Sequence, residues 1–324
     1  MRTRIVKPSP TAIKTAAKIL RAGGLVAFPT ETVYGLGACA FDSAAARRVY
    51  RAKGRPSDNP LIVHIDGEAM LNLVVRHVPP LARRLINAFW PGPLTLVLEK
   101  TAAVPFSVTG GRRTVAVRCP AHPAARALIR ALGAPIAAPS ANRSGRPSPT
   151  TAEHVLRDLN GRLPLILDGG PCRKGLESAI VDARGRRPVL LRPGTISTER
   201  IARAARAAIA APGRAAPPAP GTRHRHYSPS CRVVLISPSL IRRGSAPGPG
   251  HRDGLIHRTA WTGAHPAFSR RVPGGVAAYA RELFAALRAA ENAGISTLFV
   301  ETVPERGIGR AVMDRLRRAA EIHI

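Results

Sequence analysis

The sequence predicts an α/β fold in two parts: an N-terminal domain in which helices flank a twisted mixed sheet, and a smaller Rossmann-like α/β domain at the C-terminal end. Short apolar runs typical of strands alternate with amphipathic patterns typical of helices. Between Leu163 and Leu191 several strand-like runs follow one another, which favours a mixed sheet over a pure βαβ repeat. A Pro- and Ala-rich stretch then interrupts the pattern, so we expect domains over residues 1–210 and 231–324, joined by a linker over 211–230.

The N-terminal domain begins with a helix over residues 11–22, which ends at Gly23-Gly24. Leu25–Phe28 follows as a buried strand, and Pro29 ends it because proline cannot donate a hydrogen bond to a sheet. Asp42 and Ser43 favour a helix start, since their side chains cap free backbone N–H groups. The same reasoning gives, in order, a strand at 61–65, a helix at 80–90, strands at 94–100 and 114–119, a helix at 123–132, a strand at 135–139, a helix from Thr150, strands at 163–167, 178–182 and 189–191, and a helix from Ser197 to about Ala210.

The C-terminal domain is predicted to be a small sheet with helices. Cys231–Ser237 and Ile295–Val300 are typical of strands, and Val276–Ala290 and Arg306–Ala320 of amphipathic helices. Residues 238–275 are rich in Gly, Pro, Arg and His, so we expect loops there. No G-x-G-x-x-G motif follows a strand, so no dinucleotide site is predicted in this domain.

The chain is strongly basic. It carries 50 Lys and Arg against 19 Asp and Glu, for a formal net charge of +31 in 324 residues. Such a charge favours polyanionic partners, including nucleotides and RNA. The basic residues are almost all Arg, and Ala and Pro fill much of the rest, a pattern that a coding bias also produces. The charge is therefore weak evidence for contact with RNA.

The spacing of the cysteines and the lack of long apolar segments bear on the cellular compartment of the protein. Cys39, Cys119, Cys172 and Cys231 are widely spaced and form no C-x-x-C pair, so neither a zinc knuckle nor a redox motif is predicted. This spacing suits a reduced, cytoplasmic protein. Met1 leads into a charged segment with no signal-peptide core, and no run approaches the ~18 apolar residues that span a bilayer. We expect a cytoplasmic protein with no membrane contact.

Polar side chains gather after the first strand and after the next helix. Residues 30–34 stand at a strand end, where open α/β sheets usually bind ligands. Lys53 and Arg55 flank a glycine on a loop that looks too polar for a core, and such cations suit phosphate. Taken alone, the residues fit a solvated basic loop at least as well, and a lone His64 is more often a core residue than a ligand. The loop Pro139–Gly145 suits close approach to a ligand, although an ordinary turn also fits it.

Two long sequence blocks decide between these alternatives. PTETVYGLG, from Pro29, and KGRP-x-x-NPLIVH, from Lys53, resemble in order and spacing the opening signature of the YrdC-like family, the threonylcarbamoyl-AMP synthases. Residues 1–205 look like a full YrdC-like domain. The remainder resembles the long two-domain form of these synthases, including its closing helix GIGRAVMDRLRRAA.

The linker also carries a resemblance. Its family motif, Pro-Gly…His-Tyr-x-Pro, is matched by Pro220, Gly221, His226, Tyr227 and Pro229. Arginines stand where the motif usually has lysines, and Ser stands where Ala is common, so the charge is kept while the reach differs. Because a carbamate and a mixed anhydride both decompose in water, we expect this linker to fold over the site as a lid.

The resemblance implies a nucleotidyltransferase that makes threonylcarbamoyl-AMP and pyrophosphate from L-threonine, bicarbonate or CO2, and ATP. In the family, this is the first step in forming threonylcarbamoyladenosine next to the anticodon of tRNAs that read ANN codons. The product passes to the tRNA threonylcarbamoyl transferase complex. Mg²⁺ is expected to arrive with ATP, with no protein side chain as its ligand, and no organic cofactor is expected. No Walker A motif occurs, so side chains and Gly/Ser loops must bind the phosphates.

The family's functional positions map onto this chain in three sets. The catalytic set is Lys53, Arg55, Ser140 and Asn142, whose cations would offset the charge of the phosphates and of the developing pyrophosphate. The set for L-threonine is Thr32, His64, Arg118, Ala138 (through its main chain) and Ser178, with Arg118 forking onto the substrate carboxylate. The set for ATP is Arg55, Asn59, Thr114, Ser140, Ser148, Arg192 and Tyr227. No nucleophile–base pair is evident, so we expect catalysis by positioning and electrostatics.

Two other functions remain to be weighed. A double-stranded RNA- or tRNA-binding protein of the same fold, without synthase activity, would use the +31 charge. It would have no need for His64, Ser178 or the His-Tyr-x-Pro linker. A carbamoyl transferase of the hydrogenase-maturation type shares this domain, but the absence of zinc C-x-x-C pairs and the different flanking sequences argue against it.

Overall fold

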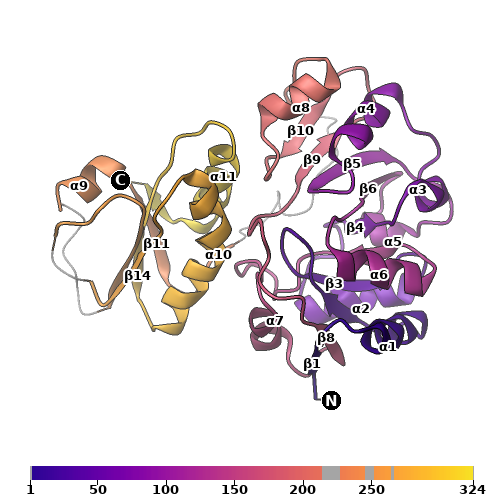
Figure 1. Ribbon diagram of the computed structural model, residues 1–324, viewed down its shortest axis with the longest axis horizontal. Coiled ribbons are helices and arrows are strands. Elements are labelled where there is room, and N and C mark those ends of the chain that lie inside the picture. Colours follow the sequence, from indigo (N-terminus) through magenta and orange to yellow (C-terminus); the bar gives the residue numbers. More distant parts are fainter. Residues whose placement is uncertain (1, 214–226, 245–251, 264–265, 324) are drawn as a thin grey trace.

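The computed structural model describes residues 2–213, 227–244, 252–263 and 266–323. These residues form a large N-terminal domain and a smaller C-terminal domain, each built on its own sheet (Figure 1). Within these ranges, no helix has the length and apolarity needed to cross a membrane. Most of the expected lid, including Pro220, Gly221 and His226, lies outside the described residues.

The N-terminal sheet is mixed, as the sequence predicts. Its strands are β1 (Arg4–Val6), β2 (Val26–Phe28), β3 (Gly35–Cys39), β4 (Ile62–His64), β5 (Leu94–Glu99), β6 (Thr114–Arg118), β7 (Ile136–Ala138), β8 (Leu165–Leu167), β9 (Ala179–Asp182) and β10 (Val189–Arg192). They lie in the order β1-β8-β2-β3-β7-β4-β6-β5-β9-β10. β4 pairs with β6 in parallel, whereas β7 lies antiparallel to both β3 and β4.

Helices cover this sheet on both faces. They are α1 (Pro10–Arg21), α2 (Ser43–Lys53), α3 (Glu68–Val74), α4 (Pro80–Phe89), α5 (Phe106–Thr109), α6 (Pro123–Leu132), α7 (Ala152–Leu159) and α8 (Thr198–Ala205). Side chains alternate along each strand. Val26 and Phe28 therefore pack with α1 and α6, while Ala27 joins the main core on the opposite face. The predicted cap of α2 is confirmed, because the Asp42 carboxylate accepts hydrogen bonds from the N–H groups of Ala44 and Ala45.

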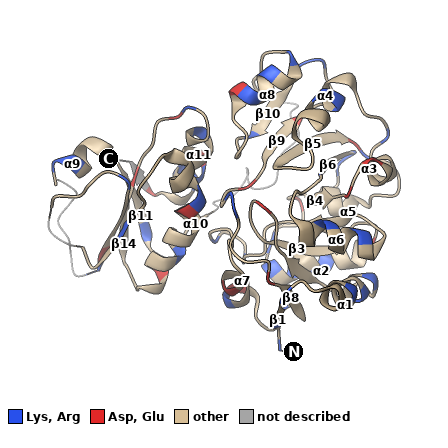
Figure 2. Cartoon of the chain, viewed as in Figure 1, with Lys and Arg blue, Asp and Glu red and all other residues tan. Residues whose placement is uncertain are grey.

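The C-terminal sheet is entirely parallel, as a Rossmann-like domain requires. Its elements are β11 (Arg232–Ile236), α9 (Pro238–Arg242), β12 (Asp253–His257), β13 (Phe268–Arg271), α10 (Val276–Asn292), β14 (Thr297–Glu301), α11 (Gly309–Ala319) and β15 (Ile322–His323). The strand order is β13-β12-β14-β11-β15. Basic residues occur on helices of both domains, including α1, α8 and α10 (Figure 2).

The two domains share apolar contacts. Val33 and Leu176 of the N-terminal part pack in the same cluster as Phe284 and Leu287 of α10. At Gly175, an added Cβ would lie 2.1 Å from the backbone oxygen of Arg281 in α10, so the two backbones approach closely. The domains are therefore docked against one another by close packing.

Strand β3 was not predicted from the sequence. Gly35–Cys39 lacks the β-branched residues that signal a strand, and no element was predicted between Pro29 and Asp42. The glycines are required by packing: a Cβ at Gly37 would lie 2.7 Å from Ile136 and 2.8 Å from Phe28. The strand forms because β2 and β7 pair with it on its two sides.

The expectation of loops throughout residues 238–275 is also wrong. Helix α9 and strands β12 and β13 lie in this region, and β12 is buried between β13 and β14. Their shortness and the surrounding Gly and Pro hide them from a periodicity argument. Helix α8 likewise ends at Ala205, not near Ala210, because Arg206 adopts a left-handed conformation with φ 53°.

Side chains of the main core should contribute most to the stability of the N-terminal domain. Leu96 is fully buried in the centre of the main core, between β6 and β9. A Leu96→Ala variant should lose about 2–5 kcal/mol of unfolding free energy, because a cavity remains where the side chain packed. Urea titration followed by circular dichroism measures this. Leu73→Ala, at a residue that is 49% exposed, is the matched control and should change stability by under about 1 kcal/mol. Equal losses in the two variants would contradict the assigned core.

Candidate active site

A cavity lies on one half of the N-terminal sheet. Helices α1 and α6 pack over β2, β7 and β8, and farther along the same face Ile62 and Ala116 belong to a small apolar cluster. His64 and Arg118 lie on this face too, because each is two residues from a member of that cluster and they are partners in the β4–β6 register. The cavity brings together these predicted residues: Thr32, Arg55, His64, Arg118, Ala138, Ser140, Ser178, Arg192 and Tyr227.

Four further predicted residues lie just behind the lining, each bonded to a residue that faces the cavity. Lys53 donates to the Ser140 carbonyl at 2.6 Å, and the Ser140 hydroxyl donates to Asn142 Oδ1 at 2.5 Å. The carbonyl of Asn59 accepts from Arg55 Nε at 3.3 Å. The fourth, Ser148, donates to the Glu177 carboxylate.

Thr114, unlike the other predicted site residues, lies away from this cavity. It lies at the start of β6 and lines a second cavity with Arg76, Lys100 and Arg113. Thr114 and Arg118 share one face of β6, but four residues of strand separate them by about 13 Å. Its assignment to the nucleotide remains a prediction.

Arg118 is held at the end of β6 by three different groups. It is 3% exposed. Its Nη1 donates to the Thr32 hydroxyl at 2.9 Å, its Nε donates to the Gly92 carbonyl at 3.2 Å, and its Nη2 lies 2.7 Å from a Glu31 oxygen. The second Glu31 oxygen accepts from the backbone N–H of Ala121. Arg118 is thus a buried, oriented cation, as a residue that binds a carboxylate must be.

Glu31 lies in the segment 30–34, which was expected at a ligand-binding strand end, but none of the three predicted sets gave it a role. Burial would raise the pKa of its carboxyl, but the charge of Arg118 outweighs that effect and leaves the pKa below the usual value. Glu31 is not part of the cavity lining. It therefore fixes the Arg118 guanidinium from the outer side. The sequence signal that could have indicated its role is its position in the segment PTET, directly after a buried strand.

His64 is buried and neutral. Burial, with the nearby charge of Arg118, lowers its pKa to about 3. Its Nδ1 lies 3.1 Å from the Ile62 carbonyl, and because a carbonyl only accepts, this nitrogen carries the proton. The ring also meets Phe28 edge to face, with 5.8 Å between centroids. His64 can thus offer a polar edge to a ligand without adding charge.

Three predicted site residues at the end of α2 and in the loop after it are more buried than expected. The loop after α2 was expected to be too polar for a core, yet Lys53, Arg55 and Asn59 are 3%, 8% and 4% exposed. Burial, reinforced by the charge of Arg55, lowers the Lys53 pKa well below its usual value. Burial also lowers the pKa of Arg55 to about 10. Gly54 and residues 56–58 are exposed, but the buried cations have carbonyl acceptors: Ser140 for Lys53, and Asn59 and Pro60 of the same loop for Arg55.

Tyr227 lines the cavity on the side of the C-terminal domain. Its ring stacks on Phe284 of α10 with 5.4 Å between centroids, and Arg315 of α11 lies 5.5 Å from the same ring. Arg315 also forms an ion pair of 3.0 Å with Glu177. Burial would raise the pKa of Glu177, but the charge of Arg315 outweighs it and keeps the carboxylate ionised. Glu177 and Arg315 were missed from the sequence, although one precedes Ser178 and the other lies in the closing helix.

Two carboxylates, Glu31 and Glu177, thus lie at or beside the cavity, and each is paired with an arginine. No group of three or more His, Cys, Asp or Glu side chains among the described residues is arranged to hold a metal ion.

The burial of neutral His64 predicts an acid sensitivity. Its folded-state pKa of about 3 lies below the ordinary 6.5, so the unfolded chain binds more protons between these values. Stability is therefore complete above pH 6.5 and falls with acidification. At pH 4.5 this residue alone should cost about 2–3 kcal/mol relative to pH 7.5. His64→Gln should lose less unfolding free energy than the unmodified protein over that range, as measured by urea titration at both pH values. Equal losses would show that His64 is not buried neutral.

Comparison with known proteins now adds to this geometry. Residues 18–194 match a family described as "Telomere recombination", and residues 196–321 match one described as "Threonylcarbamoyl-AMP synthase, C-terminal domain". The threonylcarbamoyl-AMP synthase of Pyrococcus abyssi is 44% identical, covering 96% of this chain and 95% of its own. That of Bacillus subtilis is 43% identical, covering 95% and 92%.

A solved structure agrees in both domains. The crystal structure of P. abyssi Sua5 complexed with L-threonine superposes with a TM-score of 0.90 at 42% identity, covering 99% of this chain and 100% of its own. The mixed sheet and the smaller parallel sheet therefore both have counterparts in that protein. From the cavity, the two sequence matches and this structural likeness together, we conclude that the chain belongs to the threonylcarbamoyl-AMP synthase family in its two-domain form.

Proposed function

We propose that this protein is an enzyme, a nucleotidyltransferase that forms threonylcarbamoyl-AMP and pyrophosphate from L-threonine, bicarbonate or CO2, and ATP. One observation carries the proposal: three buried guanidinium groups, those of Arg55, Arg118 and Arg192, line a single cavity. Fixed cations around a small cavity suit a substrate pair that brings a carboxylate and a triphosphate. The names of the relatives and the L-threonine in the P. abyssi crystal structure support this assignment.

Arg118 is proposed to bind the threonine carboxylate. Glu31 holds its guanidinium from outside the lining, so the group is oriented before substrate arrives. The neutral ring of His64 and the hydroxyl of Ser178 offer polar contacts to the threonine hydroxyl and amine. Ser178 is itself fixed, because its Oγ lies 2.7 Å from Thr95 Oγ1.

Nucleotide binding is assigned to the other cations. Arg55 and Arg192 would face the phosphates, with Ser140 and Asn142 orienting them. Tyr227, buried against α10, would border the nucleotide and exclude water from it. Asn59, Ser148 and Thr114 complete the proposed set for ATP, with Lys53 supporting the loop that carries Ser140.

The reaction needs no covalent enzyme intermediate. The threonine amine attacks the carbon of CO2, a C–N bond forms, and the amine loses a proton to solvent. A carbamate oxygen then attacks the α-phosphorus, and the bond to the β-phosphate oxygen breaks to release pyrophosphate. Arg55 and Arg192 would stabilise the charge that develops on the leaving group, which is electrostatic catalysis by preorganised groups.

The residues present fit a Mg²⁺ that is carried by ATP. Both carboxylates at or beside the cavity are paired with arginines, and Ser140 Oγ and Asn142 Oδ1 are hydrogen-bonded to one another, so the proposed ligands of the ion are phosphate oxygens of ATP. When bound, the ion would lower the charge of the triphosphate and polarise its phosphoryl oxygens. No organic cofactor is part of the proposal.

The product is a reactive mixed anhydride, so we propose that it is consumed by a tRNA threonylcarbamoyl transferase complex in the cytoplasm. The alternative of an RNA-binding protein without synthase activity draws on the net charge of +31. The cavity favours the enzyme, because a surface that tracks phosphates does not need buried cations around a small pocket.

Pyrophosphate release tests the proposed function. The protein with ATP, Mg²⁺, bicarbonate and L-threonine should release pyrophosphate, and omission of threonine should abolish the release. L-serine lacks one methyl group, worth about 0.8 kcal/mol when buried, and should therefore react at least about threefold less efficiently. A salt-dependent RNA shift assay runs beside it. RNA binding without any threonine-dependent release would favour the RNA-binding alternative.

Substitution at Arg118 tests the threonine subsite. Arg118→Lys keeps the charge but loses the fork, and should raise the KM for threonine at least about tenfold while the KM for ATP changes little. Arg118→Ala should show no threonine-dependent release of pyrophosphate. Steady-state kinetics with each substrate varied in turn gives both values. Full activity in Arg118→Ala would show that the carboxylate binds elsewhere.

A further inference from the structure

The C-terminal domain holds the loop on the proposed nucleotide side of the cavity. This loop, Ser140–Ser148, follows β7 and carries two of the predicted catalytic residues. The backbone N–H of Ser228 donates to the Gly145 carbonyl at 2.9 Å. Arg146 forms an ion pair of 2.6 Å with Glu291 of α10. The loop is therefore contacted by Ser228, near the end of the linker, and by Glu291 of α10.

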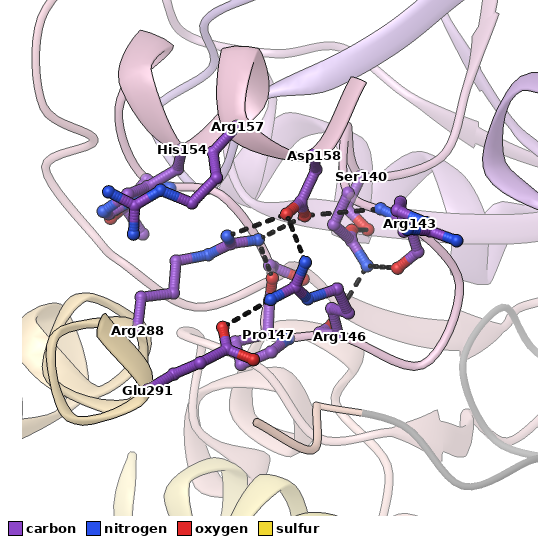
Figure 3. Close-up of polar contacts among 12 residues, drawn as sticks. Ser140, Arg143, Arg146, Pro147, His154, Arg157, Asp158, Arg288 and Glu291 are labelled. Carbon is purple, nitrogen blue, oxygen red and sulfur yellow. Dashed lines mark hydrogen bonds and ion pairs between the residues drawn. The ribbon is translucent and has the colours of Figure 1, made fainter. Parts of the chain in front are cut away.

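Arg288 is the most buried of these contacts. It projects from α10 towards the N-terminal domain and meets Asp158 of α7 (Figure 3). The ion pair is 2.7 Å long, and the two side chains are 1% and 0% exposed. The same nitrogen, Nη2, also donates to the carbonyl of Pro147 in the loop, and Nη1 donates to the other Asp158 oxygen at 3.2 Å. One arginine thus joins α10, α7 and the loop.

Asp158 also contacts the loop directly. Its carboxylate accepts from the backbone N–H of Arg143 at 3.3 Å and lies 3.4 Å from Arg146 Nη1. On the opposite side, Lys53 donates to the carbonyls of Ser140 and Asn142. The loop is therefore held between the end of α2 and the two partners Asp158 and Arg288.

We propose that Arg288, acting with Asp158, is a positioning residue, and that α10 holds the Ser140–Ser148 loop in the conformation that binds the nucleotide phosphates. The proposal rests on the proposed function and gives the C-terminal domain a part in it. Buried ion pairs add little net stability but leave a costly unpaired charge when one partner is removed, so they select one arrangement of the elements they join. In that arrangement Ser140 faces the cavity, and Asn142 and Ser148 are bonded to residues of its lining.

Domain docking and nucleotide binding are then linked. A nucleotide that contacts the loop binds the docked arrangement more tightly than an undocked one. By linkage, the docked domain strengthens nucleotide binding to the same extent. Threonine is bound by residues that neither Arg288 nor Asp158 touches, so its affinity is not coupled in this way.

The experiment replaces Arg288 in the full chain and measures two affinities. The nucleotide probe is α,β-methylene-ATP with Mg²⁺, whose carbon bridge resists cleavage, and the second ligand is L-threonine alone. Isothermal titration calorimetry of Arg288→Met should show a Kd for the analogue raised about tenfold or more, and a Kd for threonine within about twofold of the unmodified protein. Arg288→Lys should recover part of the loss, since Lys keeps the charge beside Asp158 but cannot reproduce the forked contact of Nη1 and Nη2 with both carboxylate oxygens.

Arg310→Met is the matched control. Arg310 of α11 also makes an ion pair across the domains, at 3.4 Å from Glu199, but it is partly exposed and touches no residue of the loop. This variant should bind both ligands as the unmodified protein does. Where Arg288→Met does not fold, as judged by circular dichroism, Glu291→Gln removes the Arg146 ion pair at a more accessible position and should weaken the analogue alone.

Several results would overturn the inference. The first is an unchanged Kd for the analogue in Arg288→Met, or in Glu291→Gln where that variant takes its place. The second is an equal loss of affinity for threonine in the same variant. The third is an equal loss of affinity for the analogue in Arg310→Met. The proposed function fails separately: an unmodified protein that binds no analogue at any concentration would remove both proposals. A changed Kd for the analogue with an unchanged Kd for threonine, restored in part by Lys, supports the positioning role.

Discussion

The burial of cationic side chains around one cavity is the constraint on which the rest of this structure depends. Taking an ammonium or guanidinium group out of water is costly unless its donors are satisfied. Here backbone carbonyls accept many of these hydrogen bonds: Ser140 for Lys53, Pro60 for Arg55, Gly92 for Arg118 and Ser178 for Arg192. A carbonyl satisfies a donor without cancelling its charge. The cavity therefore keeps the positive character that carboxylate and phosphate groups require.

This arrangement explains several features of the fold. Strands β4 and β7 are each three residues long, so their ends deliver side chains and carbonyls to the cavity rather than extending the sheet past it. Gly194 is needed because an added Cβ would lie 2.0 Å from the backbone nitrogen of Ala179. That close approach lets Arg192 reach the Ser178 carbonyl. The glycines and short strands thus serve the geometry of the cavity.

The second domain completes what the first begins. Arg315 keeps Glu177 ionised next to the cavity, and Arg288 joins α10 to the loop behind Ser140. The abundance of arginine looked like a background of the composition, and on the exposed helices it can be that. At these two positions the arginines are buried and paired across the domains, so they have defined structural roles. The net charge of the chain could not distinguish these buried, paired arginines from the exposed ones.

The two-domain α/β class and most of the N-terminal elements could be predicted from the sequence, and two motif blocks predicted the family and most of the residues that line the cavity. Those features depend on local periodicity and on short motifs. Tertiary structure alone decided that Lys53 and Arg55 are buried, that the glycine-rich segment Gly35–Cys39 is a strand, and that Glu31, Glu177, Arg288 and Arg315 belong with the site. Most of these outcomes depend on a partner distant in sequence: Lys53, for example, needs a carbonyl 87 residues away, whereas Arg55 finds its acceptors within its own loop. No local pattern records such a partner, because the free energy of burying a charge is set by what the folded chain places beside it.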